Sequence, residues 1–323
     1  MAGAIYPDLA GKVVLVTGVS RDVGRRYARA VADHPDVDRV IGVDVVPPRH
    51  GIGRAEFVRA DIRSPLITRI LSDNEVDTVV HMGVIATPRA GGGRATQKEI
   101  NVIGTMQLLA ACQRAESVTK LIVKSTAGVY GSSPRDPAMF TEDMSAKRMP
   151  GSGWARDSVE VEGYVRGLSR RREDIEITTL RFANVIGPRI RTAFTDHFSL
   201  PVIPIPFGFD ARLQFVHEDD CVAAIARAVS LPGLGAVNVA GDGIITVSQA
   251  ANIAGRPYVL VPRMATGSIT DLAKRFGLMD IGSDQVDVLS FGRGLDTRRM
   301  REDLGFEPAY TTRAAYEDFA RAT

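Results

Sequence analysis

The chain of 323 residues has a near-balanced charge and enough apolar residues for a large core. Lys and Arg number 40 against 38 Asp and Glu, which gives a formal net charge of +2, and hydrophobic residues make up 45% of the chain. This balance does not indicate a nucleic-acid partner, and no apolar run approaches the roughly 20 residues that a membrane span needs. Residues 1–8 resemble no signal peptide. We therefore expect a cytoplasmic protein that does not bind membranes.

The cysteines and histidines predict neither a disulfide nor a metal site. Cys112 and Cys221 lie far apart in apolar, helical surroundings, which is typical of buried reduced thiols. The five histidines do not follow the spacing of metal ligands. We expect no bound metal.

Residues 13–24 read VVLVTGVSRDVG and predict a buried strand, a tight turn and the start of a helix. Such a turn lets backbone N–H groups and the positive end of a helix meet a pyrophosphate. Asp44 ends the next apolar run, about 20 residues beyond Gly24, where a carboxylate can hold ribose hydroxyls. The pattern predicts a dinucleotide site. Its candidate residues in the turn are Gly18, Ser20, Arg21, Asp22, Val23 and Gly24.

Strands and helices then alternate along the chain, which predicts an α/β fold with a Rossmann-type, doubly wound parallel sheet. Beyond the sixth strand, prolines and glycines break the sequence into shorter pieces. We expect a dinucleotide-binding Rossmann domain over residues 1–186. Residues 187–323 should form a smaller mixed substrate-binding lobe, with some pieces returning to the first sheet. The expected later strands are 56–60, 76–81, 120–125 and 175–181, and the expected helices are 64–74, 96–115 and 154–171.

Eight runs along the chain form a recognisable series. They are TGVSRDVG (17–24), ADI (60–62), VDTVVHMG (76–83), NVIGTMQLL (101–109), KSTAGVYG (124–131), LRFANVIGPR (180–189), QFVHEDD (214–220) and DTRRMREDLGFEP (296–308). In this order they resemble the extended branch of the short-chain dehydrogenase/reductase superfamily, the NAD-dependent epimerase/dehydratase group. The resemblance covers Val13 to about Pro308, and it implies an NAD(P) cofactor and a homodimer formed through 96–115 and 154–171.

The resemblance also implies roles for single residues. Thr126 falls at the site of the family's catalytic Ser/Thr, and Tyr130 is a second catalytic candidate. Thr126, Trp154 and Asn184 would contact the substrate. The implied cofactor contacts beyond the turn are Asp44, Asp61, Ile62, Met82, Gly83, Val84, Ser125 and Asn184.

The sequence departs from the family at the residues that move protons. Family members carry a Tyr and a Lys four residues apart on one helix face, and the lysine lowers the phenol's pKa. Here the aligned positions are Trp154 and Ser158, and no Tyr-x-x-x-Lys occurs anywhere in the chain. An indole donates a hydrogen bond but does not exchange a proton usefully. The usual acid–base pair is missing.

Few side chains offer a replacement for this pair. Lys124 shares a strand face with Thr126 at period two, and it needs a partner or a water-filled pocket there. Arg156 and Asp157 lie on the rewritten helix, and we expect both to be exposed to solvent.

Three functions follow in order of preference. The first is an NAD(P)-dependent oxidoreductase, an atypical ketoreductase or alcohol dehydrogenase acting on a small-molecule carbonyl. Loss of the general acid would cost it about 10²–10⁴ in rate. The second is a catalytically silent NAD(P)-binding sensor or scaffold. The third is a sugar-nucleotide epimerase or dehydratase with relocated acid and base. Leu213 weakens this third hypothesis, because epimerases usually place a phosphate-binding arginine there.

The cofactor hypothesis has two forms. Asp44 would repel a 2′-phosphate and favours NAD(H), whereas Arg21 could attract that phosphate, so NADP(H) stays open. Family members carry a glycine in the middle of this turn. Depending on how the turn is aligned, Arg21 or Asp22 stands at that position here. A side chain at this place narrows the approach to a pyrophosphate.

Overall fold

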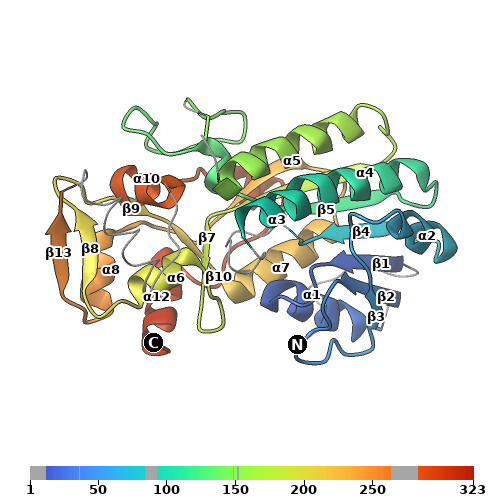
Figure 1. Cartoon of the computed structure of the whole chain (residues 1–323), viewed down its shortest axis with the longest axis horizontal. Coiled ribbons are helices and arrows are strands. Elements are labelled where there is room, and N and C mark those ends of the chain that lie inside the picture. Colours follow the sequence, from blue (N-terminus) through green and yellow to red (C-terminus); the bar gives the residue numbers. More distant parts are fainter. Residues whose placement is uncertain (1–11, 36, 84–92, 148, 151–152, 263–282) are drawn as a thin grey trace.

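A seven-stranded parallel sheet forms the centre of the molecule (Figure 1). The structure, a computed structural model, describes residues 12–35, 37–83, 93–147, 149–150, 153–262 and 283–323. The strands follow the order β11-β6-β5-β4-β1-β2-β3, and all neighbours run parallel. The sheet contains β1 (Lys12–Thr17), β2 (Val37–Asp44), β3 (Glu56–Arg59), β4 (Thr78–His81), β5 (Lys120–Thr126), β6 (Glu176–Phe182) and β11 (Gly235–Val239).

The strand order reverses between β1 and β4. The chain first builds the sheet outward from β1 through β2 to β3, and β4 then returns to the other side of β1. In doubly wound sheets such a reversal opens a crevice at the carboxyl ends of the two strands, where ligands bind. The predicted Rossmann-type fold is confirmed.

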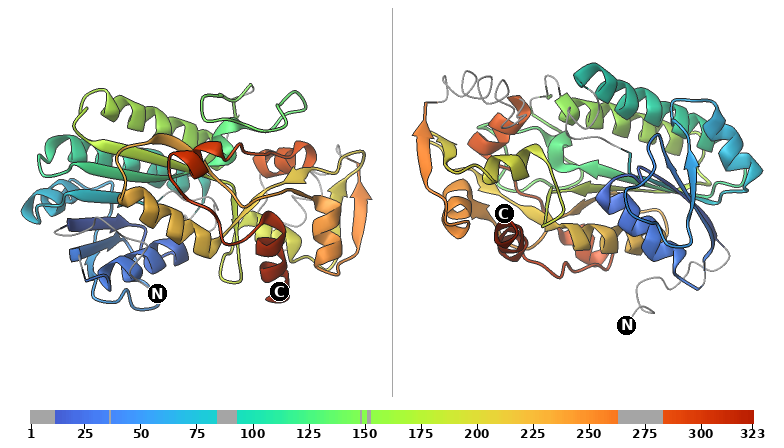
Figure 2. Two further views of the ribbon diagram at one scale, coloured as in Figure 1. Left: turned by 180° about the vertical axis from the view of Figure 1, so that it is seen from behind. Right: turned by 60° about the horizontal axis from the view of Figure 1, so that its bottom comes forward.

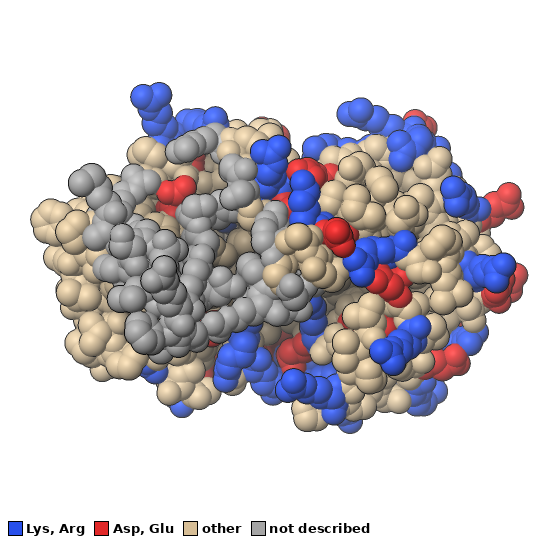
Figure 3. Space-filling view, in the orientation of Figure 1, with Lys and Arg blue, Asp and Glu red and all other residues tan. Residues whose placement is uncertain are grey.

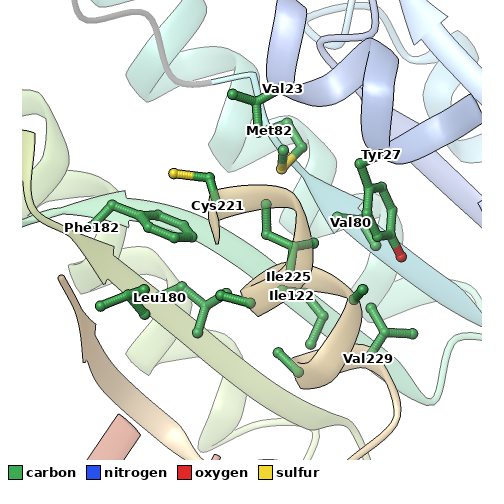
Figure 4. Close-up of a cluster of buried hydrophobic side chains, with 14 of the residues drawn as sticks. Val23, Tyr27, Val80, Met82, Ile122, Leu180, Phe182, Cys221, Ile225 and Val229 are labelled. Carbon is green, nitrogen blue, oxygen red and sulfur yellow. The ribbon is translucent and has the colours of Figure 1, made fainter. Parts of the chain in front are cut away.

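Helices cover both faces of this sheet (Figures 1 and 2). Successive residues of β1 point to opposite faces: Val14 and Val16 pack into one core, and Leu15 packs into the other. Figure 4 shows part of the first core, between the sheet and helices α1 and α7. The helices on that face are α1 (Asp22–Ala32) and α7 (Glu218–Val229), and the other face carries α2 (Leu66–Asp73), α4 (Thr105–Arg114) and α5 (Gly153–Ser169).

The single long helix predicted over 96–115 has a π-helical segment within it. Residues Arg94–Lys98 form α3, Glu99–Gly104 are π-helical, and α4 follows. The Thr105 hydroxyl donates to the Asn101 carbonyl oxygen at 2.5 Å inside this segment. Apolar spacings of three and four fit a continuous α-helix equally well, so the sequence pattern could not reveal it. Such segments are frequent at functional sites.

Most of the described residues beyond 186 form a smaller lobe with its own core, built around Phe198, Phe215 and Tyr316. Helix α7 and strand β11 also follow residue 186, and they lie in the layers of the central sheet, where returning pieces were expected. Three pairs of short strands shape the lobe: β7 (Asn184–Ile186) with β10 (Phe215–His217), β8 (Ile203–Pro206) with β13 (Tyr258–Val261), and β9 (Arg212–Leu213) with β12 (Ile245–Thr246). Its helices are α6 (Ala193–Phe198), α8 (Val247–Ile253), α10 (Ser283–Phe291) and α12 (Thr312–Arg321), and α11 (Arg298–Glu302) packs beside β11.

Basic and acidic side chains are interspersed on the face of the molecule in Figure 3. Across the described residues, no helix has both the length and the apolar character needed to cross a membrane. Cys112 and Cys221 are buried free thiols, as expected, and burial raises the pKa of Cys112 to about 12.

Gly24 fixes the first helix against the turn that precedes it. A Cβ atom at Gly24 would lie 2.4 Å from the Gly18 carbonyl oxygen, which is backbone and has no room to move. We predict that Gly24→Ala lowers the free energy of unfolding by about 1–3 kcal/mol or more. Gly163→Ala is the control, because Gly163 lies inside α5 with its nearest neighbour 3.9 Å away. It should raise stability by up to about 1 kcal/mol. Urea denaturation measures both, and equal effects would contradict the packing argument.

Candidate dinucleotide and substrate site

The turn between β1 and α1 is pressed against the end of β4. Gly18 has a φ of +77°, and its N–H donates to the Val43 carbonyl at 3.0 Å. A Cβ at Gly18 would lie 3.1 Å from the Met82 carbonyl and 3.2 Å from Gly83. Only glycine satisfies both the positive φ and this close approach. The structure therefore brings Gly18, Met82 and Gly83 together at the reversal of the sheet.

Asp44 at the end of β2 is bonded to the same turn. Its Oδ2 accepts from the Ser20 backbone N–H at 3.0 Å and from the Ser20 hydroxyl at 2.6 Å. Its Oδ1 accepts from the Val45 N–H at 2.8 Å. A carboxylate has about four acceptor positions, so Asp44 keeps room for a ribose hydroxyl.

Helix α1 presents its first turn to this crevice without a capping side chain. Arg21 stands at the N-cap position and makes no side-chain capping bond. The Asp22 carboxylate accepts a hydrogen bond from Arg25, one turn further along α1, at 2.9 Å. Val23 is buried. The backbone N–H groups of this turn are therefore available to an anion.

Three of the implied cofactor contacts are Asp61, Ile62 and Val84. Arg63 grips the Asp61 carboxylate with contacts of 2.6–3.0 Å, and these hydrogen bonds hold the pKa of Asp61 below its usual range. Ile62 is buried beneath Gly104 of the π-helical segment. Val84 lies outside the described residues.

A buried histidine joins the strands on either side of the reversal. His81 Nδ1 is 2.8 Å from the Thr17 hydroxyl of β1, and its Nε2 is 2.9 Å from the Thr105 hydroxyl of α4. Burial, together with the charge of Lys124, lowers the pKa of His81 to about 4. His81 is therefore neutral near pH 7 and bridges three elements. No local pattern predicts this bridge, since Thr17 and Thr105 are 64 and 24 positions away from His81 in the sequence.

Thr126 ends β5 and Trp154 lies beside it. The Thr126 hydroxyl accepts from the Gly128 N–H at 3.1 Å, which leaves its own proton available. The Trp154 benzo edge packs on Gly128 so closely that a Cβ there would be 2.6 Å away. The indole N–H is buried without a partner in the described structure. Ser158 donates to the Trp154 carbonyl at 2.8 Å, so its hydroxyl is already engaged.

Tyr130 is held in a buried polar network. Its hydroxyl donates to Asn238 Oδ1 at 2.7 Å and accepts from Arg181 at 2.8 Å, and its ring stacks on Phe140. Burial raises the pKa of this phenol. These contacts argue against Tyr130 as the catalytic acid or base and favour a structural role.

The same network engages Ser125, whose hydroxyl donates to Glu162 Oε1 at 2.7 Å. Glu162 also forms a buried ion pair with Arg181, with a shortest contact of 2.7 Å. Nearby, Asp157 is fully buried and accepts from the Asn101 amide at 3.3 Å. The expectation that Asp157 faces solvent is wrong, because its side of α5 packs against the π-helical segment.

Asn184 begins β7 and is partly exposed. Among the described residues, no group of three or more His, Cys, Asp or Glu could hold a metal ion.

Comparison with known proteins places this site in a family. Residues 14–240 match the NAD dependent epimerase/dehydratase family. An uncharacterized protein of Mycobacterium tuberculosis is 46% identical over 314 residues, which cover 96% of this chain and 84% of that protein. A UDP-glucose 4-epimerase of Mycolicibacterium smegmatis is 29% identical, with 78% of each chain covered.

Solved structures show the same fold. A UDP-glucose 4-epimerase of Thermotoga maritima, determined with UDP-glucose, is 21% identical and superposes with a TM-score of 0.74 over 96% of this chain and 98% of that one. A UDP-glucuronic acid 4-epimerase of Bacillus cereus, determined with UDP-glucuronic acid and NAD, is 20% identical with a TM-score of 0.72 and coverages of 96% and 98%.

The chain belongs to the NAD-dependent epimerase/dehydratase family. Its cofactor is accordingly the predicted NAD. The residues at the β1–β4 reversal fit that group, because Gly18 lies close to Met82, Asp44 keeps a free acceptor position and the first turn of α1 is uncapped.

The role of Tyr130 can be tested by removing its hydroxyl. We predict that Tyr130→Phe lowers the free energy of unfolding by about 1–3 kcal/mol, because Asn238 and Arg181 lose a buried partner. The affinity for NADH, measured by fluorescence titration, should stay within about twofold of the parent. Such a change corresponds to well below about 1 kcal/mol of binding free energy. An undiminished unfolding midpoint would contradict the structural role.

Proposed function

We propose that this protein is an NAD-dependent oxidoreductase that acts at a carbonyl or carbinol carbon of a small molecule. The observation that carries the proposal is the Thr126 hydroxyl, which is partly exposed at the carboxyl end of β5. Its oxygen is held by the Gly128 N–H, and its proton is free to bond a substrate oxygen. NAD, when bound, supplies or accepts the hydride.

The protein's own residues orient the reacting group. Thr126 donates to the substrate oxygen and stabilises negative charge that develops there. Trp154 fills the place of the family's tyrosine and covers Gly128 with its ring. Neither residue has a proton that it can transfer at neutral pH.

The proton must therefore come from water or from the substrate itself. Ser158 offers no substitute, since its hydroxyl is bonded to the Trp154 carbonyl. A missing general acid lowers the rate by about 10²–10⁴. Substrates with an activated carbonyl are consequently favoured over unactivated ones.

The buried position of Leu213 favours a substrate without a nucleotide. Leu213 is 1% exposed and pairs with Ile245, so its side chain lies in the core of the smaller lobe. Arg212 is exposed, and it faces the other side of the strand. A one-residue shift in the register of β9 would exchange the two side chains. It would bury the Arg212 guanidinium, and burial of an unpaired charge destabilises the fold.

A sugar-nucleotide epimerase is the second candidate, because the relatives with assigned activities described above are epimerases. A silent NAD-binding sensor is the third, favoured by Trp154 at the tyrosine position. NADP(H) remains an alternative cofactor through Arg21, and the homodimer through α4 and α5 stays a prediction.

Thr126→Val tests the proposal. We predict that it lowers NADH oxidation by a ketone panel about 10²-fold, because one donor to the developing oxyanion is lost, while NADH affinity is unchanged. Thr119→Val is the control, since Thr119 lies at the opposite end of β5. Loss of NADH absorbance measures turnover, and fluorescence titration measures binding. Unchanged turnover in Thr126→Val would contradict the proposal.

The same assays separate the three candidates. Conversion of UDP-glucose to its 4-epimer without net NADH consumption would establish the second. Tight NADH binding without turnover of ketones or UDP-glucose would establish the third. Activity that appears only in the double variant Trp154→Tyr with Ser158→Lys would likewise show a silent parent site.

A further inference from the structure

Two cations lie at the carboxyl edge of the sheet. Lys124 shares a face of β5 with Ile122, which belongs to the core beneath α1 and α7. Val123 pairs with His81 of β4, so Lys124 is level with Met82, whose carbonyl lies against Gly18 of the turn. Arg21 stands at the N-cap of α1, three residues beyond Gly18, and both cations are partly buried. Burial lowers the pKa of Lys124, and the charge of Arg21 lowers it further.

Neither cation forms an ion pair within the described part of the chain. No side-chain hydrogen bond joins Lys124 or Arg21 to another of these residues. The titratable groups that act on Lys124 are Arg21, Cys221 and His81. Burial raises the pKa of the Cys221 thiol and lowers that of His81 to about 4, so both are neutral near pH 7. Cys221 lies on α7, at the edge of the cluster in Figure 4.

The carboxylates of this region form no ion pair with either cation. Asp44 attracts Arg21, but its oxygens are bonded to Ser20 and Val45 and form no ion pair. Glu218 at the start of α7 is paired with Arg189 at 2.7 Å. The uncapped N-terminus of the 11-residue helix α1 adds further positive potential.

Lys120 on the same strand provides a comparison, because its ammonium group has hydrogen-bond and ion-pair partners. It lies on the same face as Lys124, at the other end of β5. Its ammonium donates to the Val229 and Leu231 carbonyls at 3.0 and 2.8 Å and pairs with Glu176 at 2.9 Å. Lys124 at the ligand edge has no such partner. An uncompensated, partly buried charge destabilises a fold unless a ligand supplies the opposite charge.

We propose that Arg21 and Lys124 form a charge pair that binds the pyrophosphate of the dinucleotide. Arg21 occupies the place of the turn's middle glycine, which otherwise lets the backbone approach the phosphates. The two cations replace that close backbone approach with direct charge contacts. The inference rests on the NAD binding of the proposed function, and it assigns the residues that hold the cofactor's negative charge.

The test compares ADP with adenosine, which lacks the phosphates. In Lys124→Met and Arg21→Met we expect ADP and NAD to bind about 10- to 100-fold more weakly by calorimetry, as hydrogen bonds to charged groups are lost. Adenosine affinity should stay within about twofold. Lys120→Met removes the same charge from the same strand and should leave ADP affinity unchanged. ADP affinity that survives both substitutions would overturn the inference.

Stability of the ligand-free protein gives a second readout. Lys124→Met should raise the thermal midpoint by roughly 1–3 °C, because it removes an uncompensated charge. Lys120→Met should lower the midpoint, because two carbonyls lose their donor. If Lys124 had only a structural role, Lys124→Met would lower the thermal midpoint. A lowered midpoint with unchanged ADP affinity would therefore overturn the inference.

Arg21→Gly restores the middle glycine and should weaken ADP binding less than Arg21→Met does. Equal losses of ADP affinity in the two variants would overturn the claim that Arg21 replaces a backbone contact with the phosphates. Absence of NAD binding in the parent protein would instead refute the proposed function. NAD binding that is indifferent to both cations would refute the charge pair alone.

Discussion

The close packing of Gly24 on the Gly18 carbonyl sets the geometry on which the rest of the site depends. It seats α1 on the turn, and Gly18 in turn lies against the Met82 carbonyl beyond β4. His81 then fastens β4 to β1 and α4 through two threonine hydroxyls. The carboxyl edge is therefore rigid where a cofactor's phosphates would lie. Small residues and buried hydrogen bonds hold this edge together.

Helix α5 carries two sets of contacts with different roles. Trp154 and Ser158 stand where the resemblance places the family's proton-transfer residues, and the Trp154 ring covers the backbone after Thr126. One turn further along α5, Glu162 holds Arg181 of β6 and Ser125 of β5. In the proposed function, the start of the helix lies beside the reacting group and leaves proton transfer to the substrate or to solvent, whereas Glu162 stabilises the fold.

The sequence predicted the features that depend on local pattern. Short apolar runs predicted the strands of the parallel sheet, and the spacing from Gly24 to Asp44 predicted the cofactor edge. Features that depend on distant partners could not be read in this way. The burial of Asp157 follows from its packing on the π-helical segment, and Tyr130 is claimed by Asn238, 108 residues away. Lys124 lacks an ion pair because the groups near it are the neutral Cys221 and His81 and the cation Arg21, and these lie far from it in the sequence.

The buried pair between Glu162 and Arg181 has a practical consequence for engineering this fold. The pair fastens α5 to the sheet at Glu162, beyond the first two turns of the helix. Substitutions at Trp154 and Ser158 therefore leave this anchor in place. They must instead respect the packing of the Trp154 ring on Gly128.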